Sequence, residues 1–420
     1  MVERYVRDVE VACSNHVTPI ECEKRRDSWF TRIPFFYYNI PIYIKEGKRT
    51  HMNEKVKNSI VVVGFLLIAI IMGMTVKLTR QIRSEQKEVS QITEESKADQ
   101  EGANEPLPNI SIETKEDIQI TISAAGDCTF ATDVNYAGGP TFVAKYNEVQ
   151  DPSYFLKNVQ SVFANDDLTI VNFEGTLTNL TTRQDKEFAF RGDPEYVQIL
   201  TSGSVEAVNL ANNHSRDYGM QSLEDTRNYL TGAGVTHFGY DQTAIYEVKG
   251  VKIGLIGIYV LPDGLGRMQQ LKDHIQKVKS EGAVITIVNF HWGIEREYYP
   301  NDVQKQLAHA AIDQGADLVI GEHPHVLQGI ETYQGKKIVY SMGNFCFGGN
   351  KNPSDKDSMI FQQTFTIRDG NILSYEDFKV IPCSISSVTN VNNYQPTILE
   401  GAEAERVSSK INEISAGLSE

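Results

Sequence analysis

Apolar residues are distributed unevenly along the 420-residue chain, and their pattern divides it into segments. One uninterrupted apolar run covers residues 59–76, and the following residues, 77–116, are mostly polar. From residue 117 onward, short apolar runs alternate with amphipathic stretches of helical period. Because short apolar runs are typical of buried strands, this alternation predicts a layered α/β fold over 117–420.

The predicted strands share a short apolar core and cover 118–124, 168–172, 205–210, 252–258, 284–289, 317–320 and 338–341. The predicted helices share an apolar face with a period near 3.6 residues and cover 153–165, 220–232, 268–281, 301–314 and 401–414. The helix over 301–314 has the clearest end signals, because Pro300 precedes it and Gly315 follows it.

The apolar run over 59–76 carries no charge and is about long enough to cross a bilayer as one helix. A buried core helix is the alternative, but a helix that is apolar all round is unusual beside so acidic a domain. We therefore expect a transmembrane helix. A slight excess of Lys and Arg before it favours a cytoplasmic segment 1–58 and an extracellular domain 117–420. Residues 77–116 hold few large apolar residues, so we expect a polar stalk there.

The net charge of −15 lies entirely on the predicted domain 117–420, because 1–58 carries +3 and 77–116 carries −3. This acidity argues against nucleic acid as a partner, and against a polyanion held by bulk charge alone. The five cysteines are odd in number and widely scattered, so they form neither a disulfide framework nor a zinc spacing. We expect buried free thiols.

Polar motifs directly follow most of the predicted strands. In chain order they are Gly-Asp at 126–127, Asn-Phe-Glu at 172–174, Asn-Asn-His at 212–214, His-Trp-Gly at 291–293, His-Pro-His at 323–325 and Gly-Asn-Phe at 343–345. Each motif alone is also a common turn, strand exit or helix entry. Since ligand sites in layered α/β folds are built at strand ends, the whole set of carboxylates, amides and imidazoles indicates a divalent metal site.

This ordered set, with Asp217, Gly219 and Gln328, resembles the CapA/PgsA family of bacterial capsule and poly-γ-glutamate biosynthesis proteins. The domain of that family is similar to the calcineurin-like metallophosphoesterases, and the resemblance covers about residue 118 to the C-terminus. It implies a four-layer α-β-β-α sandwich, with two mixed sheets face to face and helices outside. The partners that it implies are the membrane, poly-γ-glutamate synthase or export subunits, and a polyanionic polymer or phosphorylated substrate.

The resemblance also implies roles for single residues. Two divalent ions, of Mn, Zn or Fe, would be bound in two adjoining sites. The first site would use Asp127 and His325, the second Asn213, His291 and His323, and Glu174 would bridge the two. His214 would be the catalytic imidazole, oriented by Asp217 and donating a proton to the leaving oxygen. Two ions of this kind activate water and clamp a phosphoryl group.

The sequence departs from the phosphoesterase pattern at two positions. Thr129 stands where the first motif, Asp-x-His, has its histidine, and the bridging carboxylate is Glu174 instead of the usual Asp. The first metal site is therefore poorer in ligands. Arg191 and Asn344 are candidate substrate contacts; Arg191 could hold a phosphate with two hydrogen bonds, or equally form a surface ion pair.

Three functions fit these observations. The first is a membrane-anchored component of capsule or poly-γ-glutamate production. The second is a free-standing metal-dependent phosphoesterase that acts on a nucleotide, lipid or cell-wall phosphate. The third is a metal-stabilised scaffold without catalysis, which the missing histidine of the first motif favours.

Overall fold

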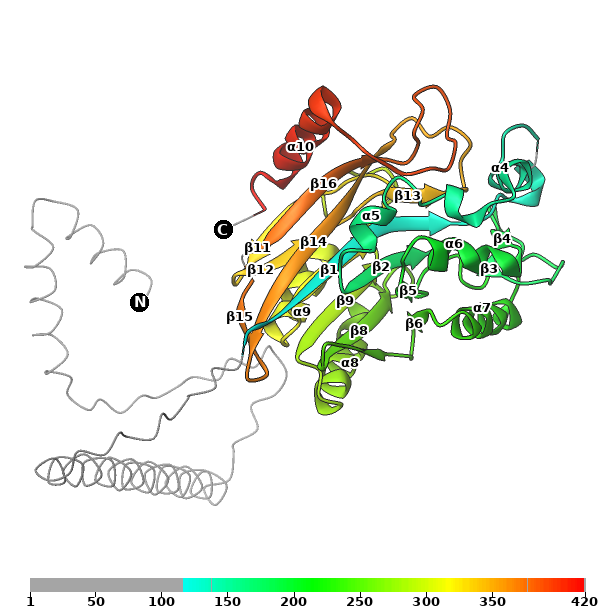
Figure 1. Cartoon of the computed structure of the whole chain (residues 1–420). Coiled ribbons are helices and arrows are strands. Elements are labelled where there is room, and N and C mark those ends of the chain that lie inside the picture. The colour runs from blue at the N-terminus through cyan, green and yellow to red at the C-terminus, as the bar shows by residue number, and fades with distance from the viewer. Residues whose placement is uncertain (1–115, 137, 376, 419–420) are drawn as a thin grey trace, which may run out of the picture. The chain divides into compact units, whose positions relative to one another are not determined.

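The computed structural model describes residues 116–136, 138–375 and 377–418 (Figure 1). The predicted cytoplasmic segment 1–58, transmembrane helix 59–76 and nearly all of the stalk 77–116 lie outside these residues. Within the described ranges, no helix is both long and apolar enough to span a membrane. The cysteines in these ranges, Cys128, Cys346 and Cys383, are buried free thiols, as predicted.

The larger of two main sheets has the strand order β17-β16-β14-β1-β2-β5-β6, with β13 beside β1 and β15 beside β14 (Figure 1). Its strands are β1 (Ile118–Thr129), β2 (Leu168–Phe173), β5 (Ala207–Asn209), β6 (Thr236–Phe238), β13 (Asn344–Phe347), β14 (Asp357–Arg368), β15 (Asn371–Ser374), β16 (Phe378–Ser384) and β17 (Thr397–Ile398). Strands β1, β2, β5, β6 and β13 pair in parallel, whereas β14 to β17 pair antiparallel, so the sheet is mixed.

The smaller sheet has the order β11-β12-β10-β9-β8-β7. Its strands are β7 (Ala244–Val248), β8 (Val251–Tyr259), β9 (Ile285–His291), β10 (Leu318–Glu322), β11 (Ile330–Tyr333) and β12 (Lys336–Val339). The four central strands are parallel and the two edge strands antiparallel. A short separate ladder joins β3 (Thr176–Leu177) to β4 (Arg191–Gly192).

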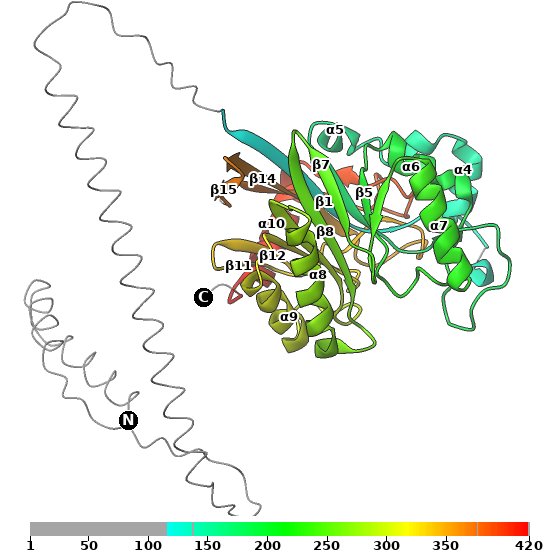
Figure 2. The same cartoon turned by 90° about the horizontal axis from the view of Figure 1, so that it is seen from below.

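The two main sheets pack face to face, because Ile122 and Ile170 of the larger sheet share one buried cluster with Ile287 and Ile320 of the smaller sheet. Helices cover the outer faces (Figure 2). The larger sheet is covered by α4 (Phe142–Val149), α5 (Gln160–Phe163), α6 (Val197–Ser202) and α7 (Met220–Gly232), and the smaller by α8 (Met268–Ser280) and α9 (Asp302–Asp313). The predicted layered α/β fold is thereby confirmed.

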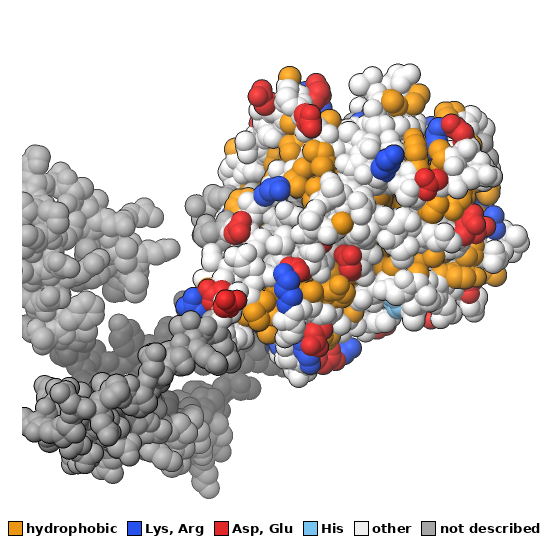
Figure 3. Space-filling view, in the orientation of Figure 1, with side chains coloured by type: hydrophobic (Ala, Val, Ile, Leu, Met, Phe, Trp, Pro, Cys, Tyr) orange, Lys and Arg blue, Asp and Glu red, His pale blue; other side chains and the backbone are white. Residues whose placement is uncertain are grey.

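The last helix, α10 (Gly401–Ser415), contacts the edge regions of both sheets, at β16 and β11. Its residues Val407, Ile411 and Ile414 join the apolar cluster between the sheets. The described residues also form the short 3-10 helices η2 (Val134–Tyr136), η3 (Pro152–Tyr154), η4 (Pro194–Tyr196) and η5 (Gly264–Arg267). On the face seen in Figure 3, Lys and Arg side chains are scattered among acidic and apolar ones instead of forming one basic patch.

Most predicted helices are confirmed, and one is wrong. Helix α7 has the predicted bounds, and α9 begins after Asn301, whose side chain caps the backbone N–H of Gln304 while the Gln304 side chain caps that of Asn301. The predicted helix over 153–165 is α-helical only at Gln160–Phe163. Two local features interrupt it. Asp151 caps a 3-10 turn instead, and Val159 has a non-helical backbone (φ −123°, ψ −11°).

Several strands run further than predicted, which changes where the polar motifs lie. The ladders extend to Thr129 in β1, His291 in β9 and Glu322 in β10. The predicted strands stopped before the polar residues that follow the apolar runs. In the structure these polar residues still pair between neighbouring strands, Asp127 with Asn172 and His291 with Glu322. The motif residues Asp127 and His291 therefore lie within strand ends, not after them.

Candidate metal centre

The layer between the sheets changes from apolar to polar near one end of the parallel strands. Side chains alternate along a strand, so Asn289 and His291 continue the face that Ile285 and Ile287 present to the core. Strands β2, β5 and β10 end in the same way, with inward-facing polar residues after apolar ones. The resulting buried polar layer contains Asn172, Asn209, Asn289, His291 and Glu322.

A β-bulge at Gly126 adds Asp127 to this layer. Ala124 faces the apolar core, so Asp127 would face the other way in a regular strand. The pairing of β1 with β2 shifts between Ala125 and Asp127, and this bulge turns the Asp127 side chain to the core face. Only glycine fits at the bulge, since a Cβ on Gly126 would lie 1.9 Å from the carbonyl oxygen of Gly343. The N–H of Asp127 donates to that same oxygen over 3.0 Å.

Glu174 lies at the centre of the imidazoles. Its Oε1 is 3.9 Å from Nε2 of His214, 3.8 Å from Nε2 of His291 and 3.9 Å from Nε2 of His325. The side chain is fully buried, and neither carboxylate oxygen has a hydrogen-bond partner among the described residues. Buried polar atoms of native proteins are normally paired, so this carboxylate lacks a counterpart that a cation would supply.

The structure brings all six predicted metal ligands together. Ligand atoms of Glu174, His323 and His325 lie within 4.8 Å of one another. A second such group consists of Asp127, His291 and Glu322. The remaining ligand, Asn213, places Oδ1 2.7 Å from Nε2 of His291. Glu322 was not among the metal ligands predicted from the sequence.

Burial sets the charge state of the donors. It raises the pKa of Glu174 and of Glu322 well above the ordinary value, and nearby Asp127 adds to both shifts. Burial also lowers the pKa of His291 well below its ordinary value and that of His323 to about 4. Both imidazoles are therefore neutral at pH 7, as metal ligands must be.

His325 differs from the other two imidazoles. Burial alone would lower its pKa, but the carboxylates of Glu174 and Asp127 raise it to about 10. Its Nδ1 lies 2.9 Å from Oδ2 of Asp127. One protonated imidazole among several buried carboxylates leaves unpaired donor oxygens, including both of Glu322. This mixture of oxygen and nitrogen donors fits a divalent transition metal.

The loop that carries His323 and His325 has a strained backbone. Their φ values are +97° and +58°, in the left-handed region that residues other than glycine rarely adopt. Such conformations cost about 1–3 kcal/mol each and persist only where the surroundings enforce them. Here the N–H of Arg296 donates to the carbonyl of Pro324, and Ser341 Oγ to that of Val326. The fold therefore holds the two imidazoles in a fixed direction.

His214 forms a dyad with Asp217, as predicted. Its Nδ1 lies 2.7 Å from Oδ2 of Asp217. Lys186 Nζ contacts Oδ1 of that carboxylate over 2.7 Å, and the N–H of Phe190 donates to Oδ2 over 2.6 Å. Burial lowers the pKa of His214, although Asp217 opposes this shift. The carboxylate thus fixes the ring with Nε2 toward Glu174, where it can exchange a proton.

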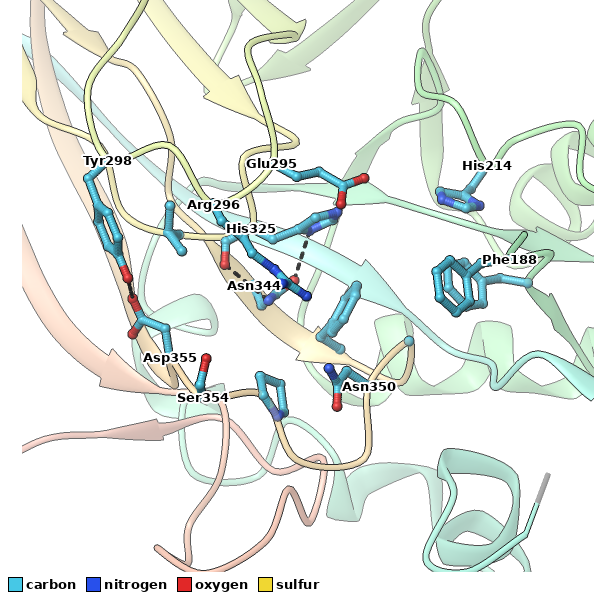
Figure 4. Close-up of a pocket in the computed structure, with 15 residues that line it drawn as sticks. Phe188, His214, Glu295, Arg296, Tyr298, His325, Asn344, Asn350, Ser354 and Asp355 are labelled. Atoms are coloured by element: carbon cyan, nitrogen blue, oxygen red, sulfur yellow. Dashed lines mark hydrogen bonds between the residues drawn. The ribbon is translucent and has the colours of Figure 1, made fainter. Parts of the chain in front are cut away.

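A pocket of about 250 Å³ opens beside His214 and His325 (Figure 4). Asn344 lines this pocket, and its side chain contacts both Nδ1 and the carbonyl oxygen of His325; its role as a substrate contact stays a prediction. Arg191 is directed elsewhere, because it donates to the carbonyl of Leu180 and lies over the ring of Tyr218. Its role as a substrate contact stays a prediction.

The remaining pocket wall contains residues that the sequence did not single out. They are the aromatic Phe188, Phe190 and Phe347 and the charged Glu295 and Arg296. Glu295 and Arg296 follow the His-Trp-Gly motif by only two or three positions, and this closeness was the one available signal. A pocket that is partly aromatic and flanked by a histidine dyad can take a small substrate beside bound cations.

Known proteins provide a comparison. The family model described as bacterial capsule synthesis protein PGA_cap matches residues 121–349. The PGA biosynthesis protein CapA of Bacillus subtilis (strain 168) is 33% identical over 230 residues, which cover 49% of this chain and 60% of that protein. The capsule biosynthesis protein CapA of Bacillus anthracis is 27% identical over 300 residues, covering 65% and 69%. Among solved structures, a 5'-nucleotidase from Candida albicans SC5314 matches with a TM-score of 0.38 and 11% identity, covering 71% of this chain and 57% of that one.

Proposed function

Because this chain belongs to the bacterial capsule synthesis protein family PGA_cap, we propose that it serves capsule or poly-γ-glutamate production through a metal-dependent phosphoesterase site. The domain would be of the calcineurin-like metallophosphoesterase type. One observation carries the proposal: Glu174 lies 3.8–3.9 Å from the Nε2 atoms of three imidazoles that come from three different parts of the fold.

The proposed site takes two divalent ions, of Mn, Zn or Fe. Asp127 and His325 would hold the first ion, and His291, His323 and Asn213 the second, with Glu174 shared between them. Bound ions supply charge stabilisation for a phosphoryl group and an activated water. The chain's own contribution is to direct several buried donors at one place before any ion binds.

His214 is the proposed acid. Its Nδ1 contacts Asp217, whose carboxylate favours the protonated imidazolium, and in that form Nε2 can donate a proton to the leaving oxygen of a substrate in the pocket. Asn344 and the aromatic wall would position that substrate. Asp217 acts as a positioning residue, because Lys186 and the Phe190 N–H fix both of its oxygens.

The proposed location is the cell surface. We infer that residues 59–76 anchor the chain with 1–58 in the cytoplasm, so that the domain works outside the cell beside the synthase or export subunits. The uninterrupted apolar run supports this proposal. A protease added to intact cells should remove the domain, and a domain that is cut only after lysis would contradict the orientation.

A non-catalytic scaffold is the second candidate function. Thr129 favours it, because this residue takes the place of a histidine and buries an Oγ1 with no hydrogen-bond partner among the described residues. The full-length chain with added Mn²⁺, assayed on a panel of phosphodiesters and phosphomonoesters, separates the two. Turnover that His214→Ala abolishes supports catalysis. Without turnover, and with polymer output unchanged in cells carrying His214→Ala, the scaffold would be the better account.

A further inference from the structure

Glu322 is a buried carboxylate that belongs neither to the proposed metal ligands nor to the histidine dyad. It is the last residue of β10, and its side chain continues the inward face of Leu318 and Ile320. It is completely buried, and neither oxygen has a hydrogen bond of normal geometry among the described residues, although the Asn209 amide lies close enough to favour its charged form. A carboxylate in this situation needs either a proton or a cation, because an unpaired buried charge is very unfavourable.

The surroundings of Glu322 favour a cation. One carboxylate oxygen of Glu322, one of Asp127 and one ring nitrogen of His291 lie within 4.8 Å of one another. Asn289, two positions before His291 on the same inward face, buries an amide whose oxygen and nitrogen also lack partners among the described residues. A proton on Glu322 would satisfy one oxygen, whereas an ion would satisfy several of these donors together.

The ligand set of the first site also lacks one donor that the phosphoesterase pattern has. Thr129 stands two residues after Asp127 on β1, where the phosphoesterase pattern has a histidine ligand. Its hydroxyl is buried and has no hydrogen-bond partner among the described residues. Glu322 approaches Asp127 from the opposite sheet, so the smaller sheet can supply a donor that the larger sheet lacks.

We propose that Glu322 is a metal ligand that acts with Asp127 and His291 and replaces the missing first-motif histidine. This inference rests on the proposed metal-dependent function and deepens it. His291, a ligand of the second proposed ion, lies beside Asp127 and Glu322, so that the two ions would adjoin. An oxygen donor in place of a nitrogen donor also favours harder cations, so the site should suit Mn²⁺ or Fe²⁺ better than a histidine site would.

The test compares Glu322→Gln with a matched control, Glu331→Gln. Glu331 is also a buried glutamate of the smaller sheet, but it contacts His309 and Tyr340 instead of the metal centre. The full-length chains are purified in mild detergent and loaded with Mn²⁺. Bound metal per chain is then measured by elemental analysis after dialysis, and Mn²⁺ affinity is measured by titration.

We expect about two Mn²⁺ per chain in the wild type and in Glu331→Gln, and about one in Glu322→Gln. The affinity for the lost ion should fall at least about tenfold. Without metal, Glu322→Gln should melt within about 2 °C of the wild type, since glutamine keeps the size of the side chain and, like a buried carboxyl that carries a proton, is neutral. An unchanged metal-free melting temperature combined with lower metal content excludes misfolding as the cause.

Two outcomes would overturn the inference, and they differ from each other. If Glu322→Gln binds as much Mn²⁺ as the wild type with equal affinity, Glu322 is a protonated packing residue and the proposed phosphoesterase site is unaffected. If the wild type itself retains no Mn²⁺, Zn²⁺ or Fe²⁺, the proposed metal-dependent function fails together with this inference.

Discussion

The carboxylate of Asp127 lies 2.9 Å from Nδ1 of His325, although Asp127 belongs to β1 of the larger sheet and His325 to the loop after β10 of the smaller one. The carboxylate favours the protonated form of the imidazole. Removing Asp127 should therefore affect this imidazole as well as the proposed metal site.

Asp127→Asn should keep the fold and lose metal-dependent stabilisation. The amide keeps an oxygen for the hydrogen bond from Asn172 Nδ2, now 2.7 Å to Asp127 Oδ1. An ion at about 100 times its dissociation constant stabilises the wild type by about 2.7 kcal/mol, and the variant should lose most of this. Thermal melting with and without Mn²⁺ measures the difference. An equal Mn²⁺-dependent shift in both proteins would remove Asp127 from the ligand set.

The contact between His214 and Asp217 predicts that loss of the His214 imidazole lowers turnover without lowering metal content. His214→Ala should lower turnover about 10²–10⁴-fold, because the leaving oxygen loses its proton donor, while metal content stays constant. His309→Ala is the control, since His309 also contacts a buried carboxylate, Glu331, over 2.8 Å. The control should keep full turnover. Steady-state rates and elemental analysis of the same samples decide the question, and loss of metal from His214→Ala would assign that residue to the ligands instead.

The bulge in β1 predicts a severe effect of one methyl group. Gly126→Ala would place Cβ against the carbonyl oxygen of Gly343, so the unfolding free energy should fall by at least about 2 kcal/mol. Gly232→Ala is the control, because no heavy atom lies within 4 Å of its added Cβ and alanine favours a helix. Urea unfolding of both variants gives the comparison. A Gly126→Ala protein as stable as the wild type would show that the bulge can relax.

The docking of α10 predicts a pH-dependent stability. Burial tends to raise the pKa of Asp357, but hydrogen bonds from Arg406 and Lys410 lower it below its ordinary value. A lowered pKa in the folded state stabilises the protein above the ordinary aspartate value of about 4, and this contribution disappears as the pH falls through the folded value. Arg406 is half exposed, so we expect only about 1 kcal/mol.

Urea unfolding of the wild type and of Asp357→Asn at several pH values tests this contribution. The two curves should differ at pH 7 and converge below about pH 4. Asp117→Asn, which removes an exposed ion pair with Arg368, is the control. Its unfolding free energy should match that of the wild type at each pH. A difference that is constant from pH 3 to pH 7 would mean that packing, not charge, accounts for the role of Asp357.

Local signals explain which parts of the fold could be predicted. Helix α9 was found because Pro300 and Gly315 mark its ends whatever surrounds it. The edge strands β7 and β11 were missed, since they are short and partly exposed and carry no long apolar run. Their pairing depends on a neighbouring strand that the sequence does not identify.

The motif residues of the candidate site could be predicted from the sequence, but the residues around them could not. The six predicted ligand residues belong to recognisable motifs, and the structure brings them together. Glu322 has no motif of its own, and a glutamate after an apolar run usually faces solvent. Only the structure shows that it lies on the inward face of β10. The direction of Arg191 was equally hidden, because it depends on Leu180 and Tyr218.

The left-handed backbone at His323 and His325 has a consequence for how such chains evolve. Glycine or asparagine would relax the main chain at either position, but neither side chain brings an imidazole. Selection for folding alone would therefore drive both histidines out of a lineage. Relatives that no longer bind the ion should be the first to carry glycine or asparagine at these two positions. The residues found there would therefore indicate whether a relative still depends on the ion.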